Sequence, residues 1–198
     1  MYYHIRGKVE EIGADRAVID AAGVGYELIC SKTTLAKLTP GKEAKLYAHL
    51  NIAQDAVALY GFHSDDERAM FRRLIGVTRI GPKVAIQTLS VLEPSDIAMA
   101  VLTDNVAAFD GVPGLGRKTA ARIILELKEK VEGVSTGAAG KTAKAGKDLS
   151  TDMRHEAIEA LVALGYDGAG AGRAVAAVED CDRVEDMIMK ALRILSNK

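Results

Sequence analysis

Two glycine-bearing stretches in the middle of the chain have the residue types and spacing of phosphate-binding turns. Residues 76–85 read GVTRIGPKVA and residues 111–120 read GVPGLGRKTA. The two stretches share Gly, Val, Gly, Lys and Ala at the same places, and each precedes a segment rich in Ala, Ile and Leu. The sequence therefore predicts one helix–turn–helix unit that is used twice.

The chemistry of such a turn follows from its backbone. Glycine adopts positive φ and lets a ligand approach the main chain closely. A helix that starts at the turn directs its first N–H groups and its positive dipole end outward, and phosphate is the usual occupant of such a position. Pro82 suits a first helical position, and Lys83, Arg117 and Lys118 add cations. The alternative is that the glycines only form tight connections between helices. Because both copies have a lysine at the same place, we favour turns that bind phosphates without recognising the base sequence.

Other chemistry finds little support in the sequence. Residues 111–119 resemble a nucleotide-binding P-loop, but Arg117 stands where lysine must follow the last glycine, and residues 135–142 begin with Ser135 instead of glycine. No His–Cys spacing fits a zinc site, and no nucleophile elbow is present. Residues 65–67 (DDE) could hold a metal, but Ser64 before them favours a helix cap. We expect no catalytic residue, no metal and no cofactor.

The elements that must position the turns indicate a multi-domain α+β protein. The first 62 residues show period-2 alternation in about five short strands, with a possible helical turn at 33–38. A small barrel with an OB-like closure is one candidate, and periodicity does not separate a barrel from a sandwich. Helical patterns begin at Ser64, residues 132–150 read as a flexible linker, and three helices are expected at about 152–164, 168–178 and 183–196. The predicted domains are residues 1–63, 64–131 and 151–198, with that linker between the second and the third.

Composition restricts the class of protein. The chain has 198 residues, of which 48% are hydrophobic and 27% charged, as in soluble globular proteins. It has no run of 18 apolar residues, and charges appear too early for a signal peptide, so we expect no membrane contact. Two distant cysteines favour a reducing cytoplasm. The net charge of −1 gives no bulk attraction for nucleic acid, so any such binding must come from local geometry.

The order of these segments resembles that of the RuvA family of bacterial Holliday-junction-binding proteins over essentially the full length. The motifs that carry the resemblance are LYGF at 59–62, IGPK at 80–83 and VPGLGRKT at 112–119. It implies an OB-fold, a tandem helix-hairpin-helix domain and a three-helix bundle, similar to a ubiquitin-associated domain, that contacts the RuvB motor ATPase. It also implies a homotetramer, with one or two tetramers on an open four-way junction, and the RuvC resolvase as a further partner. The DNA contacts that it implies are Gly76, Thr78, Arg79, Ile80, Gly81, Lys83, Gly111, Gly114, Leu115, Gly116, Arg117, Lys118, Thr119 and Arg122.

The resemblance also implies an acidic pin at the junction centre, in the turn before the last barrel strand. Asp55 can serve as the pin acid, but Gln54 stands where a second acid is expected. The alternative is that Asp55 is only a solvated acid at a hairpin tip. A further departure is Arg79, which replaces the first glycine of the first turn. We expect that turn to be less tight, with its guanidinium also contacting phosphate.

In the last segment, Leu161, Leu164 and Tyr166 match an Ala-Leu-Gly-Tyr pattern, and the resemblance implies that they contact the motor. The alternative is that they pack the bundle core.

Three functions remain open at this point. The first is a non-catalytic scaffold that binds Holliday junctions and recruits a motor for branch migration in recombination and repair. The second is a structure-specific nuclease or lyase that uses the turns for placement. The third is a protein-interaction adaptor whose turns bind no nucleic acid.

Overall fold

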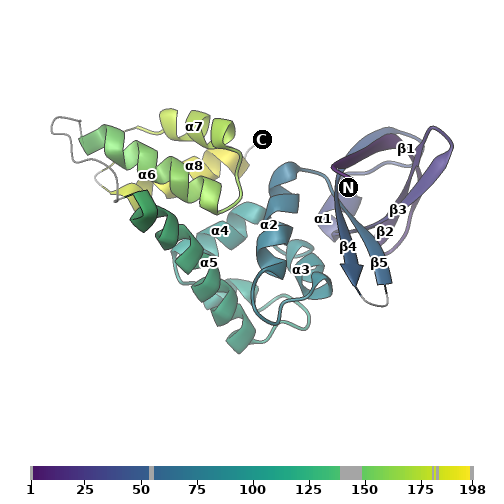
Figure 1. The fold of residues 1–198 in the computed structure, drawn as a ribbon, viewed down its shortest axis with the longest axis horizontal. Coiled ribbons are helices and arrows are strands. Elements are labelled where there is room, and N and C mark those ends of the chain that lie inside the picture. Colours follow the sequence, from purple (N-terminus) through teal and green to yellow (C-terminus); the bar gives the residue numbers. More distant parts are fainter. Residues whose placement is uncertain (1, 54–55, 139–148, 180, 182, 197–198) are drawn as a thin grey trace. The chain divides into compact units, whose positions relative to one another are not determined.

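The computed structural model describes residues 2–53, 56–138, 149–179, 181 and 183–196 (Figure 1). These residues form two compact units. The first contains the chain up to Ile75 together with Ile80–Glu93 and Gly111–Gly114. The second contains Gly76–Arg79, Pro94–Asp110 and the chain from Leu115 onward.

The first unit begins with a closed five-stranded barrel. Its strands are β1 (His4–Ile12), β2 (Arg16–Ala21), β3 (Val24–Cys30), β4 (Glu43–Ala53) and β5 (Ala56–Phe62). The barrel closes in the order β1-β2-β3-β5-β4, because β1 pairs with β4 and β3 pairs in parallel with β5. The structure therefore answers the question that periodicity left open, in favour of the barrel. The predicted helical turn is α1 (Lys32–Ala36).

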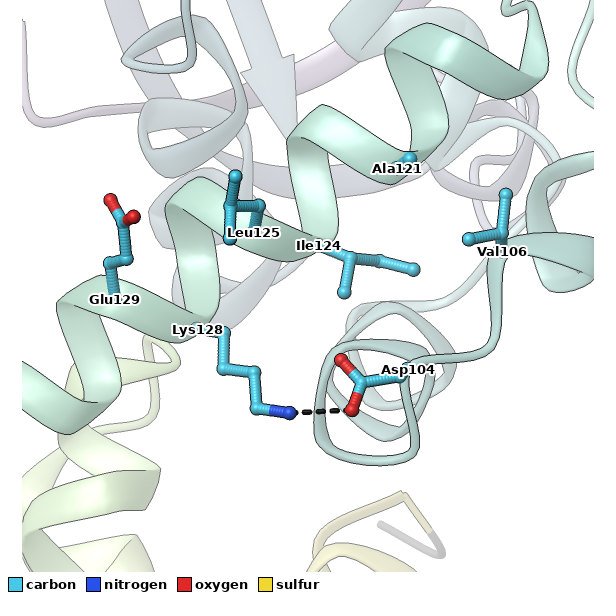
Figure 2. A pocket seen from close by; sticks show the side chains of 7 residues that line it. All are labelled: Asp104, Val106, Ala121, Ile124, Leu125, Lys128 and Glu129. Carbon is cyan, nitrogen blue, oxygen red and sulfur yellow. Dashed lines mark hydrogen bonds and ion pairs between the residues drawn. The ribbon is translucent and has the colours of Figure 1, made fainter.

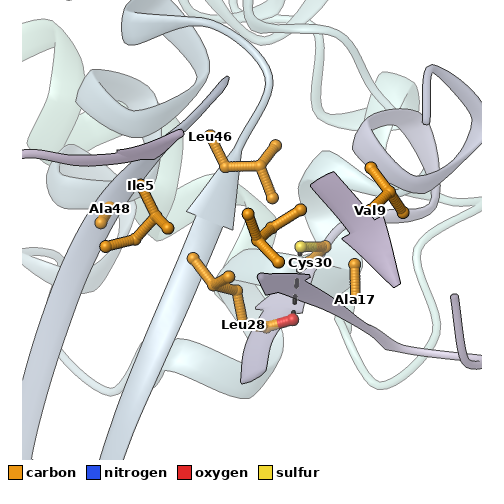
Figure 3. Packing of buried hydrophobic residues seen from close by; sticks show 8 residues of the cluster. Ile5, Val9, Ala17, Leu28, Cys30, Leu46 and Ala48 are labelled. Carbon is orange, nitrogen blue, oxygen red and sulfur yellow. Dashed lines mark hydrogen bonds between the residues drawn. The ribbon is translucent and has the colours of Figure 1, made fainter. Parts of the chain in front are cut away.

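Alternating side chains of these strands fill the barrel, as Figure 3 shows. Aromatic residues contribute little there, and the interior consists of small and aliphatic side chains. The buried cluster is Ile5, Val9, Ala17, Ile19, Leu28, Cys30, Leu46 and Ala48. Burial raises the pKa of the Cys30 thiol to about 12, with the nearby Glu67 as a second cause.

The two helical hairpins follow the barrel. The first consists of α2 (Asp65–Ile75) and α3 (Pro82–Leu89), and both lie in the first unit. The second hairpin consists of α4 (Pro94–Leu102), the 3₁₀ helix η1 (Val106–Phe109) and α5 (Arg117–Ala138), which lie in the second unit. Helix α5 continues past residue 131, where the sequence predicted a linker to begin. Extending an existing helix costs little per residue, so small residues such as those after 131 can prolong it.

Phe71 joins α2 to the barrel. Its ring centroid lies 4.9 Å from that of Phe62, 5.0 Å from that of Tyr60 and 5.3 Å from that of His49. Arg68, one turn earlier, donates a hydrogen bond of 2.9 Å to the Tyr3 carbonyl. The barrel and α2 therefore share one apolar contact surface.

The last three helices of the second unit are α6 (Leu149–Ala163), α7 (Gly168–Ala176) and α8 (Val184–Ser196). Asp167 caps α7 by accepting a hydrogen bond from the Gly170 N–H, and the Arg154 guanidinium binds the Val175 and Val178 carbonyls at its end. Within the described segments, no single helix is long and apolar enough to span a membrane. Helices α3 and α4 reach the necessary length and apolar content only when they are taken together, and that pair is bent.

Candidate nucleic-acid interface

The first turn leads from α2 into α3. Val77 and Ile80 are buried and anchor it, while Thr78 and Arg79 are exposed between them. Gly81 caps α3 in an extended conformation, and Pro82 occupies the start of the helix as expected. A Cβ on Gly81 would meet nothing within 4 Å, so no other residue fills the space beside the backbone there.

The second turn repeats this arrangement at the start of α5. Val112 and Leu115 are its buried anchors, at the positions that correspond to Val77 and Ile80. The Ala120 N–H donates to the Gly116 carbonyl at 3.0 Å, just as the Ala85 N–H donates to the Gly81 carbonyl at 3.1 Å. Both helices therefore start directly after the last glycine of their turn, Gly81 or Gly116, and both direct their first N–H groups away from the helix.

The backbone of the two turns also agrees where their sequences differ. Arg79 has φ +69°, and Gly114, its counterpart in the repeat, has φ +76°. The expectation that arginine makes the first turn less tight is wrong, because Arg79 adopts the left-handed conformation that glycine normally supplies. For a residue with a side chain this conformation costs about 1–2 kcal/mol. The chain thus keeps the turn and places a guanidinium beside it.

Each turn also meets a residue of the other hairpin. The Thr78 N–H of the first turn donates to the Glu126 carboxylate of α5 at 3.0 Å, and Arg122 lies 3.8 Å from the same carboxylate. In the second turn, a Cβ on Gly114 would lie 3.7 Å from the Gln87 Oε1 of α3. Thr78 and Arg122 are therefore engaged by an acid that sequence reasoning did not single out.

The cations at the turns fall into two groups. Within the described ranges, Lys83 and Lys118 form no ion pair and are exposed. Arg117 instead forms two hydrogen bonds with Asp110, at 3.1 and 3.3 Å. This contact lowers the pKa of Asp110 and raises that of Arg117. A phosphate at the second turn must share Arg117 with a carboxylate.

Most of the expected DNA contacts are accessible. Thr119 is half-buried, and the exposed positions are Gly76, Thr78, Arg79, Gly81, Lys83, Gly111, Gly114, Gly116, Arg117, Lys118 and Arg122. The two exceptions are Ile80 and Leu115, which are only 5% and 8% exposed. Their side chains hold the turns to the core, so only their backbone atoms could reach DNA.

The pin residues Gln54 and Asp55 lie outside the described residues. The hairpin that leads to them is β4–β5, in which Ile52 pairs with Val57 and Ala53 with Ala56.

The three residues expected to contact the motor lie in the bundle core. Leu161, Leu164 and Tyr166 are 0%, 2% and 7% exposed. The expectation that they form a contact surface is corrected, because Leu161 of α6 and both Leu164 and Tyr166, which follow α6, are buried inside the bundle. Among the bundle residues whose burial the structure describes, the large apolar side chains that are exposed are Val162 and Ile194.

A hollow of about 490 Å³ lies beside α5, and no residue of either turn lines it (Figure 2). Ile124 and Leu125 of α5 line it, and Lys128 and Asp104, which also line it, form an ion pair. Among the residues that the structure describes, no group of three His, Cys, Asp or Glu could hold a metal ion.

Comparison with known proteins covers nearly the whole chain. Residues 1–61 match the RuvA N terminal domain, residues 71–129 the SAM-like helix-hairpin-helix tandem, and residues 152–196 the RuvA C-terminal domain. A protein of Acetivibrio thermocellus is 39% identical over 99% of both chains, and one of Chlorobium limicola is 36% identical over 100% of both. One of Mycolicibacterium smegmatis is 41% identical over 84% of this chain and 82% of its own. Each of the three is named Holliday junction branch migration complex subunit RuvA.

Proposed function

The chain belongs to the RuvA family, and on that premise we propose that it binds Holliday-junction DNA as the non-catalytic subunit of a branch-migration complex. The observation that carries this function is the pair of turns with matching backbone, each at the start of a helix and each followed by an exposed lysine, Lys83 or Lys118. Such turns bind the phosphates of the DNA backbone and make no contact that distinguishes one base from another. They therefore suit a ligand that is defined by its shape.

The partners follow from the same family. We propose that four copies assemble around the junction, on one face or on both, and that this cytoplasmic complex works with the RuvB ATPase and the RuvC resolvase. RuvB would hydrolyse ATP, and this chain would orient the DNA. Assembly supports recognition because several weak turns held in one geometry gain affinity by effective concentration. Asp55 of each copy would place negative charge at the crossover, where like charges repel.

The bundle of α6, α7 and α8 is the proposed motor contact. We assign the contact to its exposed apolar side chains, Val162 and Ile194, which are 42% and 38% exposed. Leu161, Leu164 and Tyr166 would then act indirectly, by keeping the bundle folded. Val162→Asp should abolish stimulation of the motor and leave junction binding unchanged.

Fluorescence anisotropy with a four-way junction and a linear duplex of the same sequence tests the main proposal. We expect tighter binding to the junction and a steep loss of affinity with salt, because phosphate contacts release counterions. Lys83→Ala with Lys118→Ala should weaken binding and flatten the salt dependence. Lys42→Ala, an exposed lysine between α1 and β4, is the matched control. Equal affinity of the unmodified protein for both DNAs would refute the proposal.

A further inference from the structure

A buried carboxylate lies where the barrel meets the first hairpin. Glu67 of α2 is 4% exposed. Its carboxylate accepts hydrogen bonds from the Ser31 hydroxyl at 2.5 Å, the Thr34 hydroxyl at 2.6 Å and the His63 N–H at 3.1 Å. Ser31 and Thr34 belong to the start of α1, and His63 follows β5. One side chain of α2 thus fixes two segments of the barrel.

A second set of contacts joins the same short helix α1 to α3. The Thr33 hydroxyl donates to the Leu89 carbonyl at 2.8 Å, and the Lys32 N–H donates to the Ser90 hydroxyl at 3.0 Å. The Ser90 hydroxyl in turn donates to the Ile86 carbonyl at 2.7 Å. Leu89 is the last residue of α3, and the first residue of α3, Pro82, belongs to the first turn. The contacts with α1 therefore hold the far end of the helix that starts at this turn.

We propose that Glu67, Thr33 and Ser90 are positioning residues for junction selectivity: they fix the direction of α3, and of the N–H groups at its start, relative to the barrel strands. This inference rests on the proposed function. It assigns these residues no phosphate contact of their own. They determine which DNA shape several turns can grip at once.

The length of α3 turns a small rotation at its held end into a large displacement of the turn at its other end. Helix α3 has 8 residues, which is about 12 Å at the standard rise. A rotation of about 10° at its held end would move the turn by roughly 2 Å over that length. Such a shift exceeds the tolerance of a hydrogen bond. A linear duplex bound by one turn can shift with that turn and keep its phosphate contacts. A junction bound by several turns cannot keep all of its phosphate contacts when the turns are displaced.

The test combines Thr33→Val with Ser90→Ala, which breaks both links from α1 to α3. It leaves the three shorter hydrogen bonds to Glu67 in place and removes only the contacts of the Thr33 hydroxyl with Glu67 at 3.4 Å and with Ser31 at 2.8 Å. Thr33→Ser keeps the hydroxyl and serves as the conservative variant. Thr103→Val is the matched control, because the Thr103 hydroxyl donates to the Met99 carbonyl at 2.8 Å within its own helix region. Glu67→Gln is the stronger perturbation, since an amide can accept fewer of the three donors, and circular dichroism must first show that it folds.

Affinities for the four-way junction and for the linear duplex are measured for each variant. We expect the double variant to lose about tenfold in junction affinity and less than about twofold in duplex affinity, as expected when avidity is reduced. Thr33→Ser and Thr103→Val should keep both values. Equal losses on both DNAs, or no loss, would overturn the inference. If the unmodified protein fails to prefer the junction, the proposed function itself is refuted, so the two failures are distinguishable.

Discussion

Substitutions at the residue with positive φ in each turn, Arg79 or Gly114, test whether the two turns have the same backbone conformation. Arg79 has φ +69° and Gly114 has φ +76°. A side chain at such φ costs about 1–2 kcal/mol, and glycine gives back part of this through the greater freedom of its unfolded chain. We expect Arg79→Gly to be more stable than Arg79→Ala by about 1 kcal/mol. We expect Gly114→Ala to lose about 1 kcal/mol for the same reason.

Urea unfolding of the four proteins, unmodified chain included, measures these differences. Gly172→Ala is a control of opposite sign, because Gly172 lies inside α7 and a Cβ there would meet nothing within 4 Å. Alanine in a helix interior should stabilise by up to about 1 kcal/mol. If Gly114→Ala were neutral, or if Ala and Gly at position 79 were equally stable, the shared left-handed turn would be refuted.

The same variants separate the backbone of the first turn from its charge. Both Arg79→Ala and Arg79→Gly remove the guanidinium, so each should flatten the plot of log affinity against log salt by about 0.9 for every phosphate that this side chain neutralises. Gly114→Ala removes no charge and should keep that slope. An unchanged slope in both Arg79 variants would show that the guanidinium does not bind phosphate.

Three further outcomes follow from other contacts. Asp110→Asn should raise DNA affinity and steepen its salt dependence, because it releases Arg117 from the bond of 3.1 Å between them; weaker binding in anisotropy would contradict this. Burial, with nearby arginines as a further cause, lowers the pKa of His49 below its ordinary value of 6.5. The neutral ring is favoured in the folded state, so the stability that His49 contributes is complete above the unfolded pKa and is lost as pH falls through the folded pKa. The melting temperature of His49→Gln should therefore fall less steeply with acidification than that of the unmodified chain. Because burial raises the pKa of Cys30 to about 12 while Cys181 is half-exposed, Ellman's reagent should label one thiol in the folded protein and two in urea; equal rates for both thiols in the folded protein would rule this out.

Local patterns predicted the elements of the fold. Alternation predicted the strands, and the Gly-Pro and Gly-Arg-Lys sequences predicted where α3 and α5 begin, because start signals act within a few residues. The conformation of Arg79 was not predictable in this way. A positive φ at arginine is held by surrounding contacts, among them the bond from the neighbouring Thr78 N–H to Glu126, a residue 48 positions along the chain.

Glu67 shows how a local rule can predict a bond and miss a partner. The pattern Ser64-x-x-Glu67 predicted a capping box, and the Glu67 N–H does donate to the Ser64 hydroxyl at 3.1 Å. In a capping box the glutamate would reach back to the cap residue. Its carboxylate instead reaches back to the His63 N–H, one residue before the cap, and also meets Ser31 and Thr34, which are more than 30 positions away in the chain. Only a closed barrel brings those hydroxyls to α2, so no sequence window contains the signal.

The contact surface that α2 shares with the barrel constrains how this protein could exchange parts with its relatives. A chimera cut just after His63 would separate Phe71 from the rings of Tyr60 and Phe62, and would pair Glu67 with hydroxyls that another lineage need not supply. Crossovers placed after Ile75 leave these partners on one side of the break. The segment that should be exchanged as a whole at this end of the chain is therefore the barrel together with α2.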